Sequence, residues 1–119
     1  MKQKPEVVKK GWGHEIVIHN SKSYCGKILV FKKGTEGSAH FHLKKRETWY
    51  LVSGKVLITL HIKETGGTNS FYFLPGETIT IERGVVHKVT AMEDSEIFEV
   101  STRHKDSDTY RVAKGDSQK

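Results

Sequence analysis

The sequence lacks the features that mark several large classes of protein. It contains one cysteine, Cys25, so no disulfide can form within the chain. No stretch approaches the roughly 20 apolar residues that cross a membrane, and the N-terminal residues carry no apolar run of the length found in secretory signals. We therefore expect a cytoplasmic protein that does not contact a membrane, with Cys25 as a small buried side chain rather than a nucleophile.

The composition is that of one folded domain. Hydrophobic residues make up 35% of the 119 residues and charged residues 29%, which is too apolar for a disordered chain. A chain of roughly 100 to 150 residues commonly folds around one core. We predict a single domain over residues 1–119, with an N-terminal arm over about residues 1–14 and a polar C-terminal tail over about residues 103–119.

The chain is basic, with a formal net charge of +6. Its lysines and arginines are scattered, with short clusters at residues 9–10, 32–33 and 44–46. Such clusters are commonly solvated faces, but a positive field also attracts anionic ligands, which favours a small-molecule substrate such as an anionic carbohydrate. The basic residues form no stripe interleaved with aromatic residues and no helix can be placed among them, so we expect no nucleic-acid partner.

The chain shows no helical periodicity. Short runs of β-branched and aromatic residues recur about every eight to twelve residues instead, with Gly, Asn or Ser between them. This rhythm predicts an all-β sandwich or barrel, with a tight corner at Gly54, where the missing Cβ avoids a clash. The predicted strands cover residues 15–19, 24–33, 37–42, 47–53, 55–63, 70–74, 78–81, 87–90 and 96–101.

The segment from Gly34 to Gly54 carries a possible ligand set for a metal ion. Residues i and i+2 of a strand point to one face about 6.6 Å apart, so His40 and His42 can approach one ion from the same side of a sheet. A short turn separates them from Glu47, which opens the next predicted strand. The spacing therefore brings a carboxylate to the two imidazoles.

A fourth ligand has to come from another strand, and His87 is the best candidate because it begins a strand after a corner at residues 82–84. Three imidazoles and one carboxylate suit a divalent transition metal of the group zinc, manganese, iron, cobalt and nickel. Calcium prefers six to eight oxygen ligands and is disfavoured. The alternative is a metal-free barrel in which these polar residues form an ordinary half-exposed face.

Two motifs resemble those of the cupin superfamily. The first cupin motif, which contains a His-x-His pair and a glutamate between two glycines, is met at Gly34, His40, His42, Glu47 and Gly54. The second is met at Gly76, Gly84 and His87, while Glu82 and Ala91 stand where proline and asparagine are usual. The resemblance implies a cupin jelly-roll β-barrel of two antiparallel sheets, with the metal held by the three histidines and the glutamate. Small cupins often pair, so we also expect a homodimer.

A narrower resemblance, to the cupin domain of type II mannose-6-phosphate isomerases, appears toward both ends of the chain. The matching residues are Trp12, Gly13 and Glu15, then Glu47 with Trp49, then Glu99, Val100 and Ser101, and finally Asp108 with Arg111. The family often has glutamine at the position of His40. The resemblance implies an aldose-ketose isomerase that acts on a sugar or sugar phosphate, while its general base stays unassigned.

Two further residues are candidates for substrate binding. Trp49 shares a strand face with Glu47 and could stack on a sugar ring, although packing in the core is the commoner role of a buried aromatic residue. Arg111 could bind phosphate or a sugar hydroxyl through its planar guanidinium, or form a surface ion pair with Asp108.

Two other functions fit the same ligand set. Three histidines and one glutamate around ferrous iron support dioxygen chemistry in cupin dioxygenases, so a dioxygenase is the first alternative. A non-catalytic sugar-binding cupin is the second, because cupins with one fold carry many functions.

Overall fold

The structure, a computed structural model, describes residues 1–119 and consists almost entirely of β-strands. Two 3-10 turns of three residues each are its only helical elements, and neither is long enough to cross a membrane. In chain order the elements are β1 (Glu6–Lys10), β2 (Gly13–Asn20), β3 (Cys25–Phe31), β4 (Ala39–Phe41), β5 (Glu47–Ser53), β6 (Val56–His61), β7 (Thr68–Phe73), β8 (Thr78–Ile81), β9 (His87–Ala91), β10 (Ser95–Ser101), η1 (Asp106–Asp108), β11 (Tyr110–Ala113) and η2 (Asp116–Gln118).

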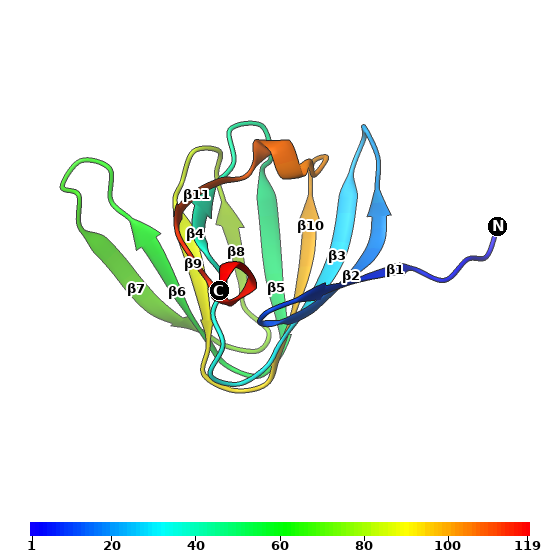
Figure 1. The fold of residues 1–119 in the computed structure, drawn as a ribbon, viewed down its shortest axis with the longest axis horizontal. Coiled ribbons are helices and arrows are strands. Elements are labelled where there is room, and N and C mark those ends of the chain that lie inside the picture. The colour runs from blue at the N-terminus through cyan, green and yellow to red at the C-terminus, as the bar shows by residue number, and fades with distance from the viewer.

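The strands form two sheets that face each other (Figure 1). The six-stranded sheet has the order β1-β2-β3-β10-β5-β8, and the five-stranded sheet has the order β11-β4-β9-β6-β7. Every paired strand is antiparallel to its neighbour. The prediction of an all-β protein with two antiparallel sheets is confirmed.

The interior arises from the alternation of side chains along each strand. In β10 the side chains of Ser95, Ile97 and Glu99 are buried, whereas those between them are exposed, because successive residues of a strand point to opposite faces. The same alternation runs through β3, beginning with Cys25, which is buried as expected. The apolar core consists of Trp12, Leu29, Phe31, Trp49, Leu51, Val56, Ile58, Phe73, Ile81, Val89, Ala91 and Ile97.

The structure differs from the sequence-based expectation at both ends of the chain. The expected N-terminal arm contains β1, which pairs with β2 from Glu6 opposite Val17 to Lys10 opposite Gly13. The expected polar tail contains β11, which pairs with β4. Beyond β11, a carboxylate oxygen of Asp116 accepts the backbone N–H of Glu36. Strand pairing and this hydrogen bond therefore hold the C-terminal residues against the barrel, although they form no hydrophobic run.

The strand predicted over residues 37–42 is shorter in the structure, where β4 covers only Ala39–Phe41. His42 follows directly after it, and the backbone carbonyl of His42 accepts the N–H of Gly84 from the loop before β9. The chain leaves the sheet at this point because the backbone of His42 hydrogen-bonds to a loop instead of to a neighbouring strand. The His-x-His pair therefore lies at the end of β4, where the chain turns toward β5.

We predict that Gly54→Ala destabilises the fold. Gly54 has a φ of 94°, and a Cβ at this position would lie 2.4 Å from the backbone oxygen of Asp94. Backbone strain of this kind costs on the order of 1 to 3 kcal/mol before the clash is counted. Chemical denaturation should show the loss in the free energy of unfolding. Gly37→Ala is the matched control, because a Cβ there meets nothing within 4 Å, and equal stabilities of the two variants would contradict this account.

Candidate metal centre

Three histidines converge inside the barrel. His40 lies in β4 directly opposite His87, the first residue of β9, and His42 follows two residues later on the same side. One ring nitrogen from each of the three lies within 4.8 Å of the others. The i, i+2 spacing and the antiparallel pairing of β4 with β9 together produce this cluster.

Backbone carbonyl groups orient the imidazoles. Nδ1 of His42 lies 3.1 Å from the carbonyl oxygen of Asp108, and Nδ1 of His87 lies 2.9 Å from that of Val85. A carbonyl oxygen can only accept, so Nδ1 of both residues carries a proton, and in the neutral imidazole Nε2 keeps its lone pair. Nδ1 of His40 lies near both the hydroxyl and the carbonyl oxygen of Ser38, at 2.9 and 3.1 Å. Metal-binding histidines are commonly oriented in this way.

Burial also favours the uncharged form of two of these imidazoles, His40 and His87. Burial lowers the pKa of His40 to about 3, and the positive charge that His87 and His42 would carry if protonated lowers it further. Burial likewise lowers the pKa of His87 from its usual range. A neutral imidazole is the form that binds a metal ion.

Glu47 brings a carboxylate to the imidazoles. Its side chain is buried, and its Oε1 accepts the indole N–H of Trp49 at 2.8 Å. Its Oε2 has no hydrogen-bond partner and lies 3.3 Å from Nε2 of His42 and 3.8 Å from Nε2 of His87. Burial acts to raise the pKa of Glu47, and the nearby charge of Lys45 opposes that effect.

The donor set fits a divalent metal ion. A buried carboxylate oxygen without a hydrogen-bond partner is uncommon in folded proteins. Here that oxygen faces Nε2 of His42 and of His87. Three neutral imidazoles and one carboxylate are the ligands that zinc and the neighbouring transition metals accept. The cluster consists of His40, His42 and His87, and Glu47, the fourth residue predicted from the sequence, places its free oxygen beside it.

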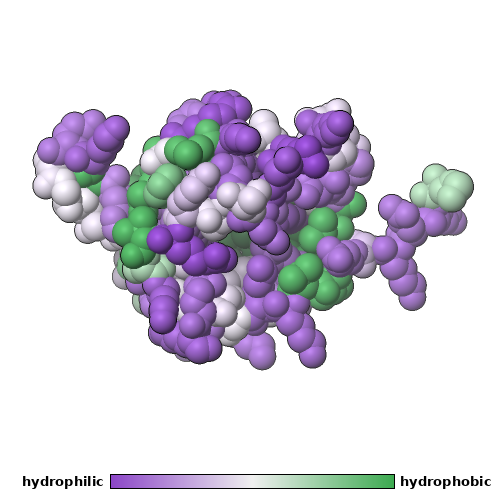
Figure 2. Space-filling view, turned by 45° about the horizontal axis from the view of Figure 1, so that its top comes forward, coloured by the Kyte–Doolittle hydropathy of each residue, from purple (hydrophilic) through white to green (hydrophobic).

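The ligands border a cavity of about 110 Å³ in the barrel. A larger hollow of about 860 Å³ lies outside it, under the N-terminal segment from Gln3 to Lys10. Five residues line both spaces, so the two meet at a shared rim of Lys10, Glu15, Lys27, His104 and Asp106. Figure 2 shows that hydrophilic residues cover most of the face turned toward the viewer, with hydrophobic residues gathered in separate patches.

Trp49 lies both in the apolar core and at the wall of the cavity, the two positions that its predicted roles require. Its side chain is 3% exposed and belongs to the apolar core, and its ring also borders the cavity. The ring of His87 packs edge-on against it, with centroids 5.5 Å apart. Trp49 therefore packs in the core and hydrogen-bonds the carboxylate that faces the imidazoles.

Arg111 borders the same cavity from β11, opposite His40. It forms no ion pair with Asp108. The carboxylate of Asp108 instead accepts the backbone N–H groups of residues 43–45, at 3.0 to 3.2 Å. These bonds lower the pKa of Asp108 against the effect of burial. The guanidinium of Arg111 is left free to meet a ligand.

Glu82, which stands where the second cupin motif usually has proline, forms an ion pair with Arg46. Its two carboxylate oxygens accept hydrogen bonds from Nε and a terminal nitrogen of Arg46 at 2.6 and 3.0 Å. Arg46 precedes Glu47, and Glu82 lies in the turn before His87. This ion pair is exposed and contributes little energy by itself, but it joins the two loops that carry ligands.

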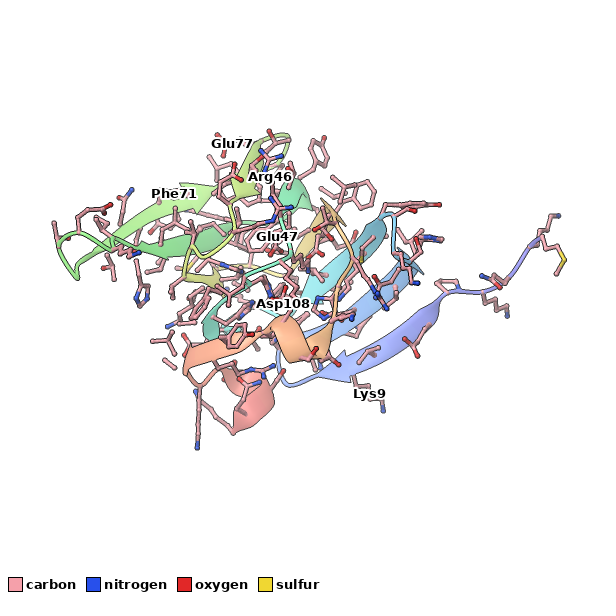
Figure 3. All side chains as sticks on the ribbon, turned by 90° about the horizontal axis from the view of Figure 1, so that it is seen from above. Lys9, Arg46, Glu47, Phe71, Glu77 and Asp108 are labelled. Carbon is pink, nitrogen blue, oxygen red and sulfur yellow. The ribbon has the colours of Figure 1, made fainter.

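The sequence did not predict that four further charged or polar residues lie at the cavity. Lys27, Lys45 and Glu99 are each 3% exposed, and His104 lies next to His42, with ring centroids 6.1 Å apart. Figure 3 places Glu47 near the middle of the view, among side chains from both sheets. The alternation of β3 and β10 puts Lys27 and Glu99 at inward positions, so a charged residue at an inward position was the available signal.

Comparison with known proteins agrees with this geometry. Residues 1–112 match the family described as mannose-6-phosphate isomerase C-terminal. Over 69 residues the chain is 35% identical to a mannose-1-phosphate guanylyltransferase of Salmonella muenchen, a stretch of 57% of this chain and 15% of that protein. The chain thus corresponds to a small part of that relative.

Solved structures of other proteins share the fold. The capsular polysaccharide assembling protein CapF of Staphylococcus aureus superposes with a TM-score of 0.81 at 18% identity, over 95% of this chain and 33% of CapF. A point mutant of the Bacillus subtilis oxalate decarboxylase OxdC superposes with a TM-score of 0.80 at 17% identity, over 91% of this chain and 30% of that one. The predicted cupin jelly roll is confirmed.

We predict that His42→Ala and His87→Ala each abolish stoichiometric metal binding and lower the melting temperature of the metal-loaded protein. A metal that binds only the folded state stabilises it, so loss of a ligand removes that stabilisation. Elemental analysis and thermal unfolding, with and without a chelator, measure the two effects. His61→Ala, at the end of β6 and outside the cluster, is the control. Unchanged metal content in both ligand variants would contradict the assignment.

Proposed function

The chain belongs to the mannose-6-phosphate isomerase C-terminal family, and from this premise we propose that it is a metal-dependent cupin that interconverts an aldose and a ketose on a plain or phosphorylated sugar. The observation that carries the proposal is the convergence of three imidazoles and an unpartnered carboxylate oxygen at a cavity lined with charged groups. The family supports the carbohydrate chemistry, and the ligand set supports the dependence on metal.

The proposed reaction needs an acidified C–H bond beside a carbonyl group. A divalent ion held by His40, His42, Glu47 and His87 would supply Lewis acidity to the carbonyl and to the neighbouring hydroxyl oxygen. The protein orients its own groups for this task. Carbonyl oxygens hold a proton at Nδ1 of His42 and of His87, and the indole N–H of Trp49 engages one oxygen of Glu47 so that the other faces the imidazoles.

The inner cavity and the outer hollow together fit a sugar whose reacting end and whose remainder differ in size. The inner cavity of about 110 Å³ accepts only the few reacting atoms of a sugar, while the outer hollow of about 860 Å³ has room for the remainder. The polar rim offers both donors and acceptors, as sugar hydroxyl groups require. Arg111 adds a guanidinium that can bind phosphate in a bidentate manner.

We predict that the purified protein, loaded with zinc, manganese, cobalt, nickel or iron, interconverts mannose and fructose or their 6-phosphates. NMR of the sugar mixture detects the conversion directly. The His87→Ala variant and chelator-treated protein should show no turnover, whereas His61→Ala should keep it.

Two results would overturn this function. Sugar binding without conversion across mannose, fructose and lyxose and their phosphates would identify a non-catalytic binding module. Iron-dependent consumption of oxygen with a thiol or a diketone, without isomerisation, would identify a dioxygenase.

We predict that Arg111→Gln weakens recognition of the phosphorylated substrate. A hydrogen bond to a charged group contributes roughly 1.5 to 3 kcal/mol, so KM for the sugar phosphate should rise about tenfold or more. KM for the plain sugar should change little. Steady-state kinetics on both substrates separate these effects, with Arg103→Gln, which does not border the cavity, as the control. Equal changes in KM for both substrates would show that Arg111 does not read the phosphate.

A further inference from the structure

The wall of the barrel interior next to the metal ligands is charged. The carboxylates of Glu15, Glu47 and Glu99 and the ammonium groups of Lys27 and Lys45 border the cavity, and all except Glu15 are 3% exposed. Taking a charge out of water costs several kcal/mol unless an opposite charge and hydrogen bonds compensate for it. The arrangement of these charges therefore needs a reason beyond packing.

The ammonium group of Lys45 lies between two of the carboxylates. It is 2.7 Å from Oε2 of Glu99 and 3.9 Å from Oε1 of Glu47. Lys27 is placed with Glu15 instead, at 3.4 Å. Lys45 is consequently the one cation within ion-pair distance of the carboxylate that faces the imidazoles.

A third contact holds this ammonium in place. Nδ1 of His104 lies 3.2 Å from Nζ of Lys45, and Nε2 of His104 lies 2.9 Å from a carboxylate oxygen of Asp106. The ammonium group can only donate and the carboxylate can only accept, so Nδ1 of His104 accepts from Lys45 while its Nε2 donates to Asp106. Glu99, His104 and Glu47 thus surround one charge.

We propose that Lys45 is the built-in counter-charge of the metal centre: it stabilises the metal-free barrel by compensating Glu47 and Glu99, and it lowers the affinity of the site for a divalent cation. The two effects have one electrostatic origin. Without metal, the ammonium is the positive charge nearest to both carboxylates. With metal, two cations share the carboxylate of Glu47 and repel each other, which weakens binding.

Lys45 also acts as a positioning residue for Glu47. Its ammonium and the indole N–H of Trp49 both lie on the side of Oε1, at 3.9 and 2.8 Å. Oε2 is thereby left to face His42 and His87. The inference deepens the proposed function, since it rests on the metal binding proposed above and concerns neither the sugar nor the reaction.

The test compares Lys45→Met, Glu99→Gln and the double variant with the wild type, and Lys44→Met is the control, because the side chain of Lys44 is exposed on the same loop. Competition with a chelating dye measures the affinity for Co²⁺ or Zn²⁺, and thermal unfolding is followed with and without metal. The visible spectrum of the cobalt protein reports on the ligands themselves.

Lys45→Met should lower the melting temperature of the metal-free protein and bind metal at least about tenfold more tightly, because a nearby positive charge has been removed. The metal should then raise the melting temperature more than it does in the wild type. The double variant removes one charge of each sign, so its metal-free stability should partly recover and its affinity should return to within about threefold of the wild type. The cobalt spectrum should change in Lys45→Met and stay unchanged in Lys44→Met.

Equal or weaker metal affinity in Lys45→Met, with wild-type affinity for Lys44→Met, would overturn the inference and leave the proposed function intact. A wild-type protein that takes up no metal would overturn the proposed function, and the counter-charge role with it. If Lys45→Met does not fold without metal, the double variant still decides the question. A double variant that also fails to fold without metal would show that Lys45 does not compensate the charge of Glu99.

Discussion

The single backbone pairing between β4 and β9, at His40 and His87, is the contact on which the rest of the site depends. It places two imidazoles from distant parts of the chain side by side, and the i, i+2 spacing then adds His42. A shift of this pairing by one residue would turn the side chains of one strand to the opposite face of the sheet. The core packed between the two sheets resists such a shift, so the fold itself keeps the ligands together.

Asp108 gives the ligand loop a second support. Its carboxylate accepts N–H groups from residues 43–45, and its backbone carbonyl oxygen lies 3.1 Å from Nδ1 of His42. One residue near the C-terminus therefore holds both the turn that leads to Glu47 and the orientation of an imidazole. The D-x-x-R pattern seen in the sequence gains a physical meaning: its aspartate supports the loop, and its arginine is free to face the cavity.

The sequence predicted most of the strands and the pair His40 and His42, because both signals are local, whereas His87 was predicted from its place at the start of a distant strand. Alternation reveals a strand without knowledge of its neighbour, and His40 and His42 share a face through their spacing alone. The strands β1 and β11 were missed because they are short and most of their side chains are exposed, and they exist through pairing with β2 and β4. Lys45 was missed for a related reason. A lysine within a basic run resembles a solvated residue until the fold places Glu99 and His104 around it.

The N-terminal segment that extends away from the barrel in Figure 1 has a consequence for how this protein can diverge. Residues 3–6, together with Val8 and Lys10, wall the outer hollow, and none of them belongs to the ligand cluster. Changes in the length or composition of this segment can therefore reshape the outer hollow while the imidazoles and the carboxylate stay in place. The outer hollow and the histidine cluster can thus vary independently.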